Sequence, residues 1–196
     1  MVLLHGYGAD EHDLAPLAAH IDPAGDYFVI CPRAPYDVPP YGAGWYERDT
    51  NGNIDTDMFL ASVDAVDSAI DRACAKGGFD RAEAVVVGFS QGGAMTLASS
   101  LRAGGATRPA AIACLSGMMQ SVEGLSYDLA DGDKGPLPRV LVQHGTVDPM
   151  VTIDRGQHTR DALAASDVAH TYREYPMGHE ITGESLADLR DWLRAG

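Results

Sequence analysis

The stretch Ala84-Val85-Val86-Val87-Gly88-Phe89-Ser90-Gln91-Gly92-Gly93-Ala94 joins an apolar, β-branched run to a run of small residues that continues in a helical pattern. It therefore predicts a strand, a tight turn at Ser90 and a helix. Such a turn projects the serine hydroxyl above the edge of a sheet, and the flanking glycines relieve the crowding of its backbone. A chance match in a glycine-rich chain is the alternative, but the strand and the helix on either side favour a nucleophilic serine.

Apolar runs alternate with helical patterns along the rest of the chain, which is typical of a parallel α/β sheet covered on both faces. We expect a mostly parallel central sheet of about six strands, at residues 2–5, 27–31, 84–89, 111–115, 139–143 and 170–175. Helices are expected from about Asp10, at residues 57–76, after Ser90, at residues 154–165 and around Leu186, Leu189 and Leu193. Residues 1–196 fit a single domain without a separate cap. The long connections 32–55 and 117–138 are expected to carry function.

A serine hydroxyl becomes an effective nucleophile only when a base removes its proton and an acid orients that base. His179 follows the last predicted strand, at the carboxyl edge of the sheet, so we predict that it is the base. Of the other histidines after Ser90, His158 falls within a predicted helix and His170 begins a strand. His144 precedes any well-placed acid.

The acid should lie between the serine and the histidine in the chain. Asp148 follows the strand predicted at 139–143 and lies at the same edge of the sheet, so we predict that it orients His179. Asp154 competes for this role, but it is better placed to cap the next helix.

The loop Leu4-His5-Gly6-Tyr7-Gly8 follows the first predicted strand and provides another part of the site. An oxyanion hole needs backbone N–H groups beside the nucleophile, one of them from the residue that follows it. We assign these two groups to Gln91 and Tyr7. His5 is expected to brace the loop by a side-chain hydrogen bond rather than to act as a base.

The composition excludes several classes of protein. A formal net charge of −14 leaves too little cationic surface to bind nucleic acid. No stretch is apolar enough to span a membrane, no secretory signal is visible, and no cluster has the spacing of metal ligands. Three cysteines, two of them in apolar runs, fit a reducing, cytoplasmic setting. The excess of acidic over basic residues reflects either adaptation to high salt or a GC-rich genome.

Seven motifs resemble those of the bacterial phospholipase/carboxylesterase family, which is similar to the eukaryotic acyl-protein thioesterases. In chain order they are Leu4-His5-Gly6-Tyr7-Gly8-Ala9-Asp10, Pro32-Arg33-Ala34-Pro35, Trp45-Tyr46, Gly88-Phe89-Ser90-Gln91-Gly92-Gly93-Ala94, Leu115-Ser116-Gly117, His144-Gly145-Thr146-Val147-Asp148-Pro149 and Gly178-His179-Glu180-Ile181. The resemblance implies an α/β-hydrolase fold, a triad of Ser90, Asp148 and His179, and an oxyanion hole at Tyr7 and Gln91. It also implies hydrolysis of small carboxylic esters or thioesters without a cofactor.

Two features depart from the family pattern. Tyr7 stands where the family often has Leu, which places a phenol near the pocket. The chain also begins at the strand that bears His5, without the antiparallel strand pair that usually precedes it. The protein is then either naturally short or cut at its start. A sheet edge left uncovered would favour association, including a homodimer.

Ligands in this fold bind beyond the carboxyl ends of the strands. Trp45, Met118 and Met150 are expected there as an apolar slot for short or medium acyl groups, unless they only pack their own loops. We therefore expect a serine carboxylesterase that hydrolyses short- to medium-chain esters through an acyl-enzyme. The alternatives are an acyl-protein thioesterase or lysophospholipase-type hydrolase, and a non-catalytic binding module. Such modules normally lack a triad residue.

Overall fold

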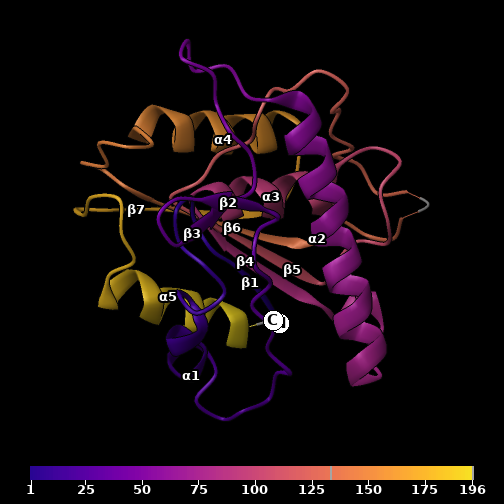
Figure 1. Ribbon diagram of the computed structural model, residues 1–196. Helices are drawn as coiled ribbons and strands as arrows, with labels where there is room; N and C mark the ends of the chain where they lie inside the picture. Colours follow the sequence, from indigo (N-terminus) through magenta and orange to yellow (C-terminus); the bar gives the residue numbers. More distant parts are fainter. Residues whose placement is uncertain (133, 196) are drawn as a thin grey trace.

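The computed structural model of the protein describes residues 1–132 and 134–195. Its centre is a parallel sheet in the spatial order β1-β4-β5-β6-β7 (Figure 1). These strands are β1 (Val2–Leu4), β4 (Val85–Phe89), β5 (Ala111–Leu115), β6 (Arg139–Gly145) and β7 (His170–Tyr175). Because neighbouring strands all run in parallel, their carboxyl ends lie along one edge of the sheet.

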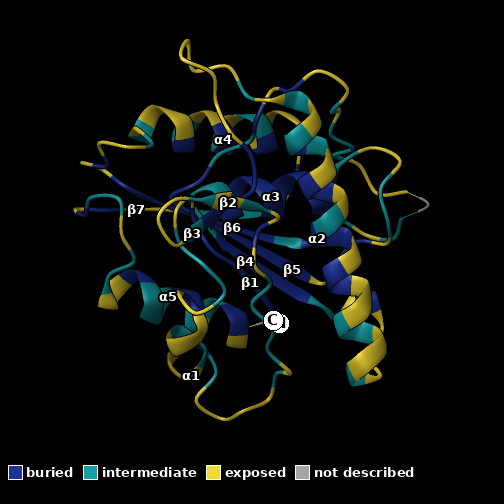
Figure 2. Ribbon diagram, viewed as in Figure 1, coloured by how far each residue is buried: buried dark blue, intermediate teal, exposed yellow. Residues whose placement is uncertain are grey.

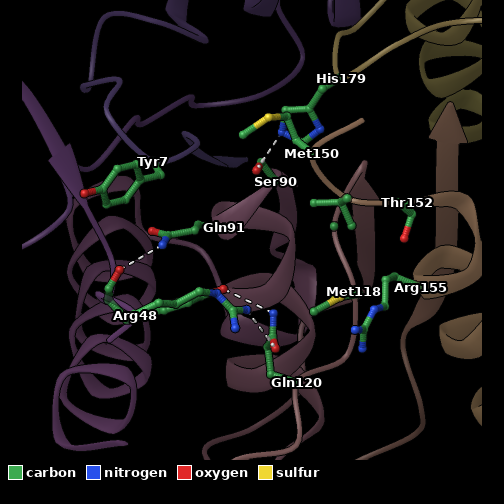
Figure 3. Close-up of a pocket in the computed structure, with 13 residues that line it drawn as sticks. Tyr7, Arg48, Ser90, Gln91, Met118, Gln120, Met150, Thr152, Arg155 and His179 are labelled. Atoms are coloured by element: carbon green, nitrogen blue, oxygen red, sulfur yellow. Dashed lines mark hydrogen bonds between the residues drawn. The ribbon is translucent and has the colours of Figure 1, made fainter. Parts of the chain in front are cut away.

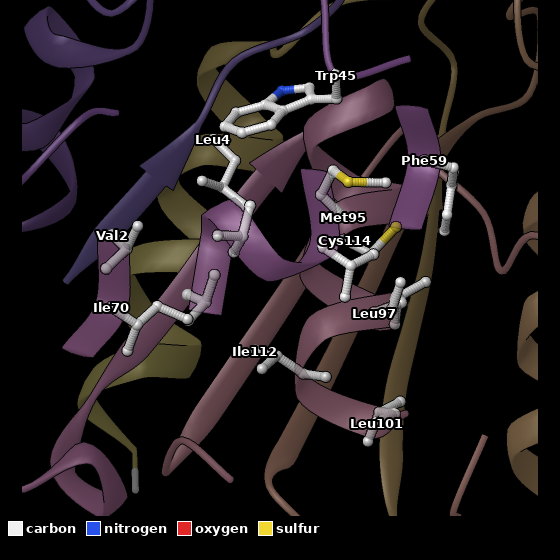
Figure 4. Packing of buried hydrophobic residues seen from close by; sticks show 14 of the residues in the cluster. Val2, Leu4, Trp45, Phe59, Ile70, Met95, Leu97, Leu101, Ile112 and Cys114 are labelled. Carbon is white, nitrogen blue, oxygen red and sulfur yellow. The ribbon is translucent and has the colours of Figure 1, made fainter. Parts of the chain in front are cut away.

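Successive residues of the strands pack into two hydrophobic cores, one on each face of the sheet. On one face Val86 and Ile112 pack with residues of α2 (Thr56–Gly77), α3 (Gln91–Leu101) and α4 (Ile153–Ala165), a cluster that Figure 4 shows in close-up. On the other face Val87 and Ala113 pack with residues of α1 (Ala18–Ile21) and α5 (Gly183–Arg194). Strands β1, β4, β5 and β6 and the inner faces of the helices are accordingly mostly buried, whereas β7, at the edge of the sheet, is largely half-buried or exposed (Figure 2). None of the described helices is long and apolar enough to cross a membrane.

The helix predicted at residues 57–76 forms as α2. The Asp55 carboxylate accepts a hydrogen bond from the Met58 N–H at 2.9 Å and so caps its first turn. Gly78 ends the helix with φ at 73°, a conformation that favours glycine. The helices predicted after Ser90, at residues 154–165 and at the end of the chain are also present, as α3, α4 and α5.

The segment at residues 27–31, predicted as a sixth strand, is not a strand, so the sheet has five strands rather than about six. Only Ile30 pairs with β1, through an isolated bridge. The Asp22 carboxylate accepts a hydrogen bond from the Tyr27 N–H at 2.8 Å and holds the start of the segment in a turn. Pro32 has no N–H with which to extend the pairing. The outer edge of β1, expected to be open, is partly covered by this segment.

The helix expected from Asp10 begins later, at Ala15, as the 3-10 helix η1 (Ala15–Leu17) that leads into α1. The Asp10 carboxylate instead accepts a hydrogen bond from the His12 N–H at 2.8 Å within a turn. Pro16 lies in the first turn of η1, where its missing N–H costs nothing. In a helix that began at Asp10, Pro16 would have been an interior residue.

The first long connection contains a small antiparallel sheet of its own, β2 (Tyr36–Val38) and β3 (Gly42–Gly44). Ala43 accepts a hydrogen bond from the Gly8 N–H at 2.8 Å and donates one to the Ala9 carbonyl at 2.7 Å. These bonds hold the connection against the loop after β1. The residues that follow β3 are therefore placed at the carboxyl edge of the sheet.

A buried ion cluster of Asp67, Arg81 and Arg102 joins α2 to the 3-10 helix η2 (Arg81–Glu83) and to the end of α3. One oxygen of the Asp67 carboxylate accepts a hydrogen bond from Arg81, and the other accepts one from Arg102 at 2.6 Å. Asp64 and Asp71, both exposed, are outer partners of the same arginines at 2.7 Å. The cluster thus ties together the helices that pack behind Ser90.

Candidate active site

Ser90 lies in the turn between β4 and α3, as predicted, with φ at 56° and ψ at −117°. A positive φ is strained for a residue with a side chain. The Leu115 carbonyl accepts a hydrogen bond from the Ser90 N–H at 2.8 Å and so helps to fix the turn. The flanking glycines are required by close backbone contacts. A Cβ on Gly88 would lie 2.1 Å from the Gly92 carbonyl oxygen, and one on Gly92 would lie 2.1 Å from the Leu4 carbonyl oxygen.

His179 and Asp148 continue a line of hydrogen bonds from Ser90, the first of which is drawn in Figure 3. The Ser90 Oγ lies 2.9 Å from His179 Nε2, and His179 Nδ1 lies 2.7 Å from Asp148 Oδ2. A proton on Nδ1 satisfies the carboxylate and leaves Nε2 free to accept the serine proton. Three loops, after β4, β6 and β7, bring these residues together.

Asp148 is only 4% exposed, and its second oxygen accepts hydrogen bonds from the backbone N–H of Met150 at 2.8 Å and of Val151 at 2.9 Å. Burial opposes its ionisation, but the hydrogen bonds from His179 and from these two amides outweigh that effect. The pKa of Asp148 therefore lies below its ordinary value. The residue is a carboxylate at neutral pH and can orient the imidazole.

The competing residues lie elsewhere. Asp154 is in the first turn of α4 with its side chain 70% exposed. Thr152, not Asp154, is the N-cap residue, so the capping role expected of Asp154 is also wrong. His144 is buried behind the acid, with Nε2 2.7 Å from the Val151 carbonyl and 3.9 Å from Asp148 Oδ2.

Tyr7 and Gln91, whose backbone N–H groups are predicted to form the oxyanion hole, line the same cavity as Ser90. Gln91 is the first residue of α3, so its amide has no partner one turn earlier in the helix. The loop with Tyr7 packs against the serine, because a Cβ on Gly6 would come within 3.3 Å of the Ser90 Cβ. Neither amide donates a hydrogen bond to any described residue. The oxyanion-hole role of both groups stays a prediction.

His5 makes the bracing hydrogen bonds expected of it. Its Nε2 accepts the Ala34 N–H at 3.1 Å, and its Nδ1 lies 2.8 Å from the Gly6 carbonyl. The His5 carbonyl in turn accepts the indole N–H of Trp45 at 2.8 Å. These contacts fix the loop after β1 to the first long connection.

A cavity of about 410 Å³ opens in front of Ser90 and His179 (Figure 3). Met118 and Met150 line it, as predicted, whereas Trp45 does not. Trp45 is 1% exposed and packs in the core beside Leu4 (Figure 4). The prediction that Trp45 lines the cavity is wrong. The first long connection folds back at β2 and β3 and places the indole beneath the site. Contact of the two methionines with an acyl group stays a prediction.

Five polar or aromatic residues of the cavity wall were not predicted: Tyr46, Arg48, Gln120, Thr152 and Arg155. The Gln91 side chain positions one of them, Tyr46, since it donates to the Tyr46 carbonyl at 2.8 Å and accepts the N–H of the preceding Trp45 at 3.0 Å. Tyr46 could have been inferred from the Trp45-Tyr46 motif, which it completes. No sequence signal places Arg48, Gln120 or Arg155 at the site.

Within residues 1–132 and 134–195, no group of three or more His, Cys, Asp or Glu side chains is arranged to hold a metal ion. Independence from a metal or cofactor stays a prediction.

A parallel sheet with a serine on a strand-to-helix turn, followed by an acid and then a histidine after later strands, is the arrangement of α/β-hydrolases. The described residues form this fold without a separate cap domain. The chain belongs to the phospholipase/carboxylesterase family, whose pattern matches residues 1–195. The family and fold predicted from the motifs are thus confirmed.

Two plant relatives support this assignment. A probable carboxylesterase SOBER1-like of Arabidopsis thaliana is 33% identical over 71% of this chain and 52% of its own length. Carboxylesterase SOBER1 of the same plant is 31% identical over 83% of this chain and 67% of its own length. The chain thus spans about half of the first relative and about two thirds of the second. The crystal structure of esterase PE8 has a TM-score of 0.82 and 27% identity, covering 99% of this chain and 90% of that one.

Proposed function

We propose that the protein is a serine carboxylesterase that hydrolyses small esters of short to medium acyl chains through an acyl-enzyme. The observation that carries the proposal is the line of hydrogen bonds from Asp148 through His179 to Ser90, at the mouth of the cavity. Membership of a family of hydrolases supports it independently. Residues 1–196 would form the single catalytic domain.

Acylation begins when the Ser90 Oγ attacks the ester carbonyl carbon and the hydroxyl proton passes to His179 Nε2. The carbonyl oxygen gains the negative charge and accepts hydrogen bonds from the Tyr7 and Gln91 amides. The bond to the alcohol oxygen then breaks, and that oxygen takes the proton from His179. Asp148 stabilises the imidazolium between these steps without itself taking the proton.

Deacylation repeats the sequence with water. Water gives a proton to His179 Nε2 and attacks the acyl carbon on Ser90, and the oxyanion is held at the same two amides. The carboxylic acid leaves, and Ser90 recovers its proton from His179. No step of the proposed reaction requires a metal or a cofactor.

The form of the cavity favours short and medium acyl chains. It is open to solvent beside Met150, which is 74% exposed. Each methylene gains about 0.8 kcal/mol only when it is buried. The distal methylenes of a palmitoyl chain would extend beyond the cavity, so they would add little to binding.

Covalent labelling tests the reaction class. A fluorophosphonate probe should label the wild-type protein at Ser90, and Ser90→Ala should lose both the label and p-nitrophenyl acetate hydrolysis. Ser68→Ala is a matched control on the exposed side of α2 and should keep both. Persistence of full labelling in Ser90→Ala would overturn the proposal, as would a folded wild type that neither reacts with the probe nor hydrolyses esters.

A series of p-nitrophenyl esters at submicellar concentration tests the chain length. Acetyl to hexanoyl esters should turn over faster than palmitoyl, and Met150→Trp should shift the preference toward acetyl. Equal or faster turnover of palmitoyl esters would contradict this and favour the acyl-protein thioesterase alternative, a class also found among the relatives. Matched oxygen and sulfur esters would then separate the two activities.

Cys31, Cys74 and Cys114 are free thiols, which supports the cytoplasmic location that we propose. The homodimer expected from the sequence rested on an open edge at β1, and the Ile30 segment lies against that edge. A dimer is therefore not part of our proposal.

A further inference from the structure

The charge of the cavity wall is opposite to that of the whole protein. The chain has 28 acidic and 14 basic residues. The thirteen residues that line the cavity beside Ser90 nevertheless include Arg48 and Arg155 and no carboxylate. At the average composition of the chain, thirteen residues would include about two carboxylates. The site therefore presents positive charge within an acidic surface.

Arg48 is held in place by uncharged groups. It donates a hydrogen bond to the Gly52 carbonyl at 2.8 Å and lies 3.5 Å from the Gln120 Oε1, and its guanidinium lies over the Tyr46 ring. Gln120 is itself buried and donates to the Tyr46 hydroxyl at 3.2 Å. No described carboxylate lies within ion-pair distance of Arg48. Its charge remains available to a ligand.

Arg155 contributes a second cation from the opposite wall (Figure 3). Its one ion pair among the described residues is an exposed contact of Nε with Asp154 at 3.7 Å, which leaves both terminal nitrogens without a carboxylate. It lies in the first turn of α4, where the helix dipole disfavours a cation. The fold therefore gains little stability from Arg155 at this position, whereas an anion in the cavity would be attracted by both the arginine and the helix N-terminus.

The cavity beside Ser90 continues into a second hollow on the side of the two arginines. This second hollow, of about 410 Å³, shares Arg48, Met118, Gln120 and Arg155 with the cavity beside Ser90. The two hollows thus adjoin along these four residues. A ligand can therefore extend from Ser90 past Met118 to the arginines.

The geometry points to an anion subsite: the preferred esters carry a carboxylate or phosphate group that Arg48 and Arg155 bind while Ser90 attacks the ester carbonyl. A guanidinium matches the planar oxygen pair of a carboxylate or two phosphate oxygens, and such charge-assisted hydrogen bonds are stronger than neutral ones. Gln120 positions Arg48 for this contact. The inference rests on the proposed esterase activity and adds a substrate class to it.

Matched ester pairs test the subsite. The acyl-side pair is p-nitrophenyl hydrogen adipate and its methyl ester, and the alcohol-side pair is 4-acetoxybenzoate and its methyl ester. The third comparison sets 4-acetoxyphenyl phosphate against phenyl acetate. In at least one pair the kcat/KM of the anionic ester, corrected for spontaneous hydrolysis, should exceed that of the neutral ester by roughly tenfold, as expected for solvent-exposed charge-assisted contacts. The pair that responds identifies the anion and the side of the ester that carries it.

Charge variants provide the second measurement. Arg48→Gln and Arg155→Gln should each lower the anionic-to-neutral ratio of kcat/KM severalfold, and Arg48→Glu should lower it further. Arg72→Gln makes the same change of charge on the exposed side of α2, away from both hollows, and should leave the ratio unchanged. A purely structural role for Arg48 would lower both rates together and keep the ratio.

Two failures are distinguishable. Equal or slower hydrolysis of the anionic ester in all three pairs, with the neutral esters still hydrolysed, would overturn the anion subsite alone. A folded protein that hydrolyses neither form and does not react with a fluorophosphonate would overturn the esterase proposal on which the subsite rests.

Discussion

Two aspartates of this protein are almost equally buried and differ in their partners. Asp148 is 4% exposed and contacts one imidazole and two backbone amides, whereas Asp67 is 6% exposed and contacts two guanidinium groups. A guanidinium keeps its proton at any pH a protein experiences, but an imidazole exchanges its proton near neutrality. The buried carboxylate of Asp148 can therefore assist proton transfer. That of Asp67 can only hold secondary-structure elements together.

The largest effect should follow from neutralising the first carboxylate. Asp148→Asn should lower kcat for p-nitrophenyl acetate by about 10³- to 10⁴-fold, because an amide favours the wrong histidine tautomer. Circular dichroism should report a folded protein. Asp154→Asn is the matched control, and Asp148 would be the wrong assignment if that variant lost activity while Asp148→Asn kept it.

The second carboxylate should matter for stability instead. Asp67→Asn leaves Arg81 and Arg102 without their shared buried partner and should lower the free energy of unfolding by about 3 kcal/mol. Urea denaturation at neutral pH measures this loss, and kcat per folded molecule should stay within about twofold of wild type. Asp71→Asn alters an exposed partner of the same cluster and should cost under about 1 kcal/mol. A large loss of kcat in folded Asp67→Asn would show that Asp67 also supports catalysis, and would contradict the distinction between the two aspartates.

Acidification should separate the contribution of Asp148 from that of its partner His179. The pKa of Asp148 lies below the ordinary value of an aspartate, so the residue stays ionised between pH 8 and 5 and adds no step to the activity profile there. The base must be neutral to accept the Ser90 proton, and kcat/KM should therefore fall in a single step as the pH is lowered from 8 to 5. A rate that stayed constant across this range would argue against His179 as the base.

The smallest effect concerns the exposed acids that belong to neither site. If the net charge of −14 is an adaptation to salt, screening of self-repulsion should raise the melting temperature, with most of the gain complete by about 1 M NaCl. The buried cluster around Asp67 is shielded from the salt and should contribute little to this rise. An unchanged melting temperature would leave genome composition as the explanation of the acidic surface.

The nucleophile could be predicted from sequence because its own neighbours specify the turn that holds it. Gly88 carries a signal because it approaches the Gly92 carbonyl within that turn, and Gly92 carries one because its backbone lies against the Leu4 carbonyl at the end of β1. Arg48 and Trp45 carried none, since their places depend on how the first long connection folds back through β2 and β3. The prediction of a strand at 27–31 was wrong for a similar reason. The segment has the apolar residues of a strand, but the turn at Asp22 and the missing N–H of Pro32 limit its pairing with β1 to one residue.

The exposed mouth of the cavity beside Met150 also bears on the fate of an acyl group attached to Ser90. With no cap domain among the described residues, dissolved alcohols and amines would reach the acyl carbon by the same route as water. The intermediate would therefore partition among competing nucleophiles according to their concentration and reactivity, giving new esters or amides alongside the free acid. Acyl transfer to added methanol or ethanol is the behaviour that such an open site implies.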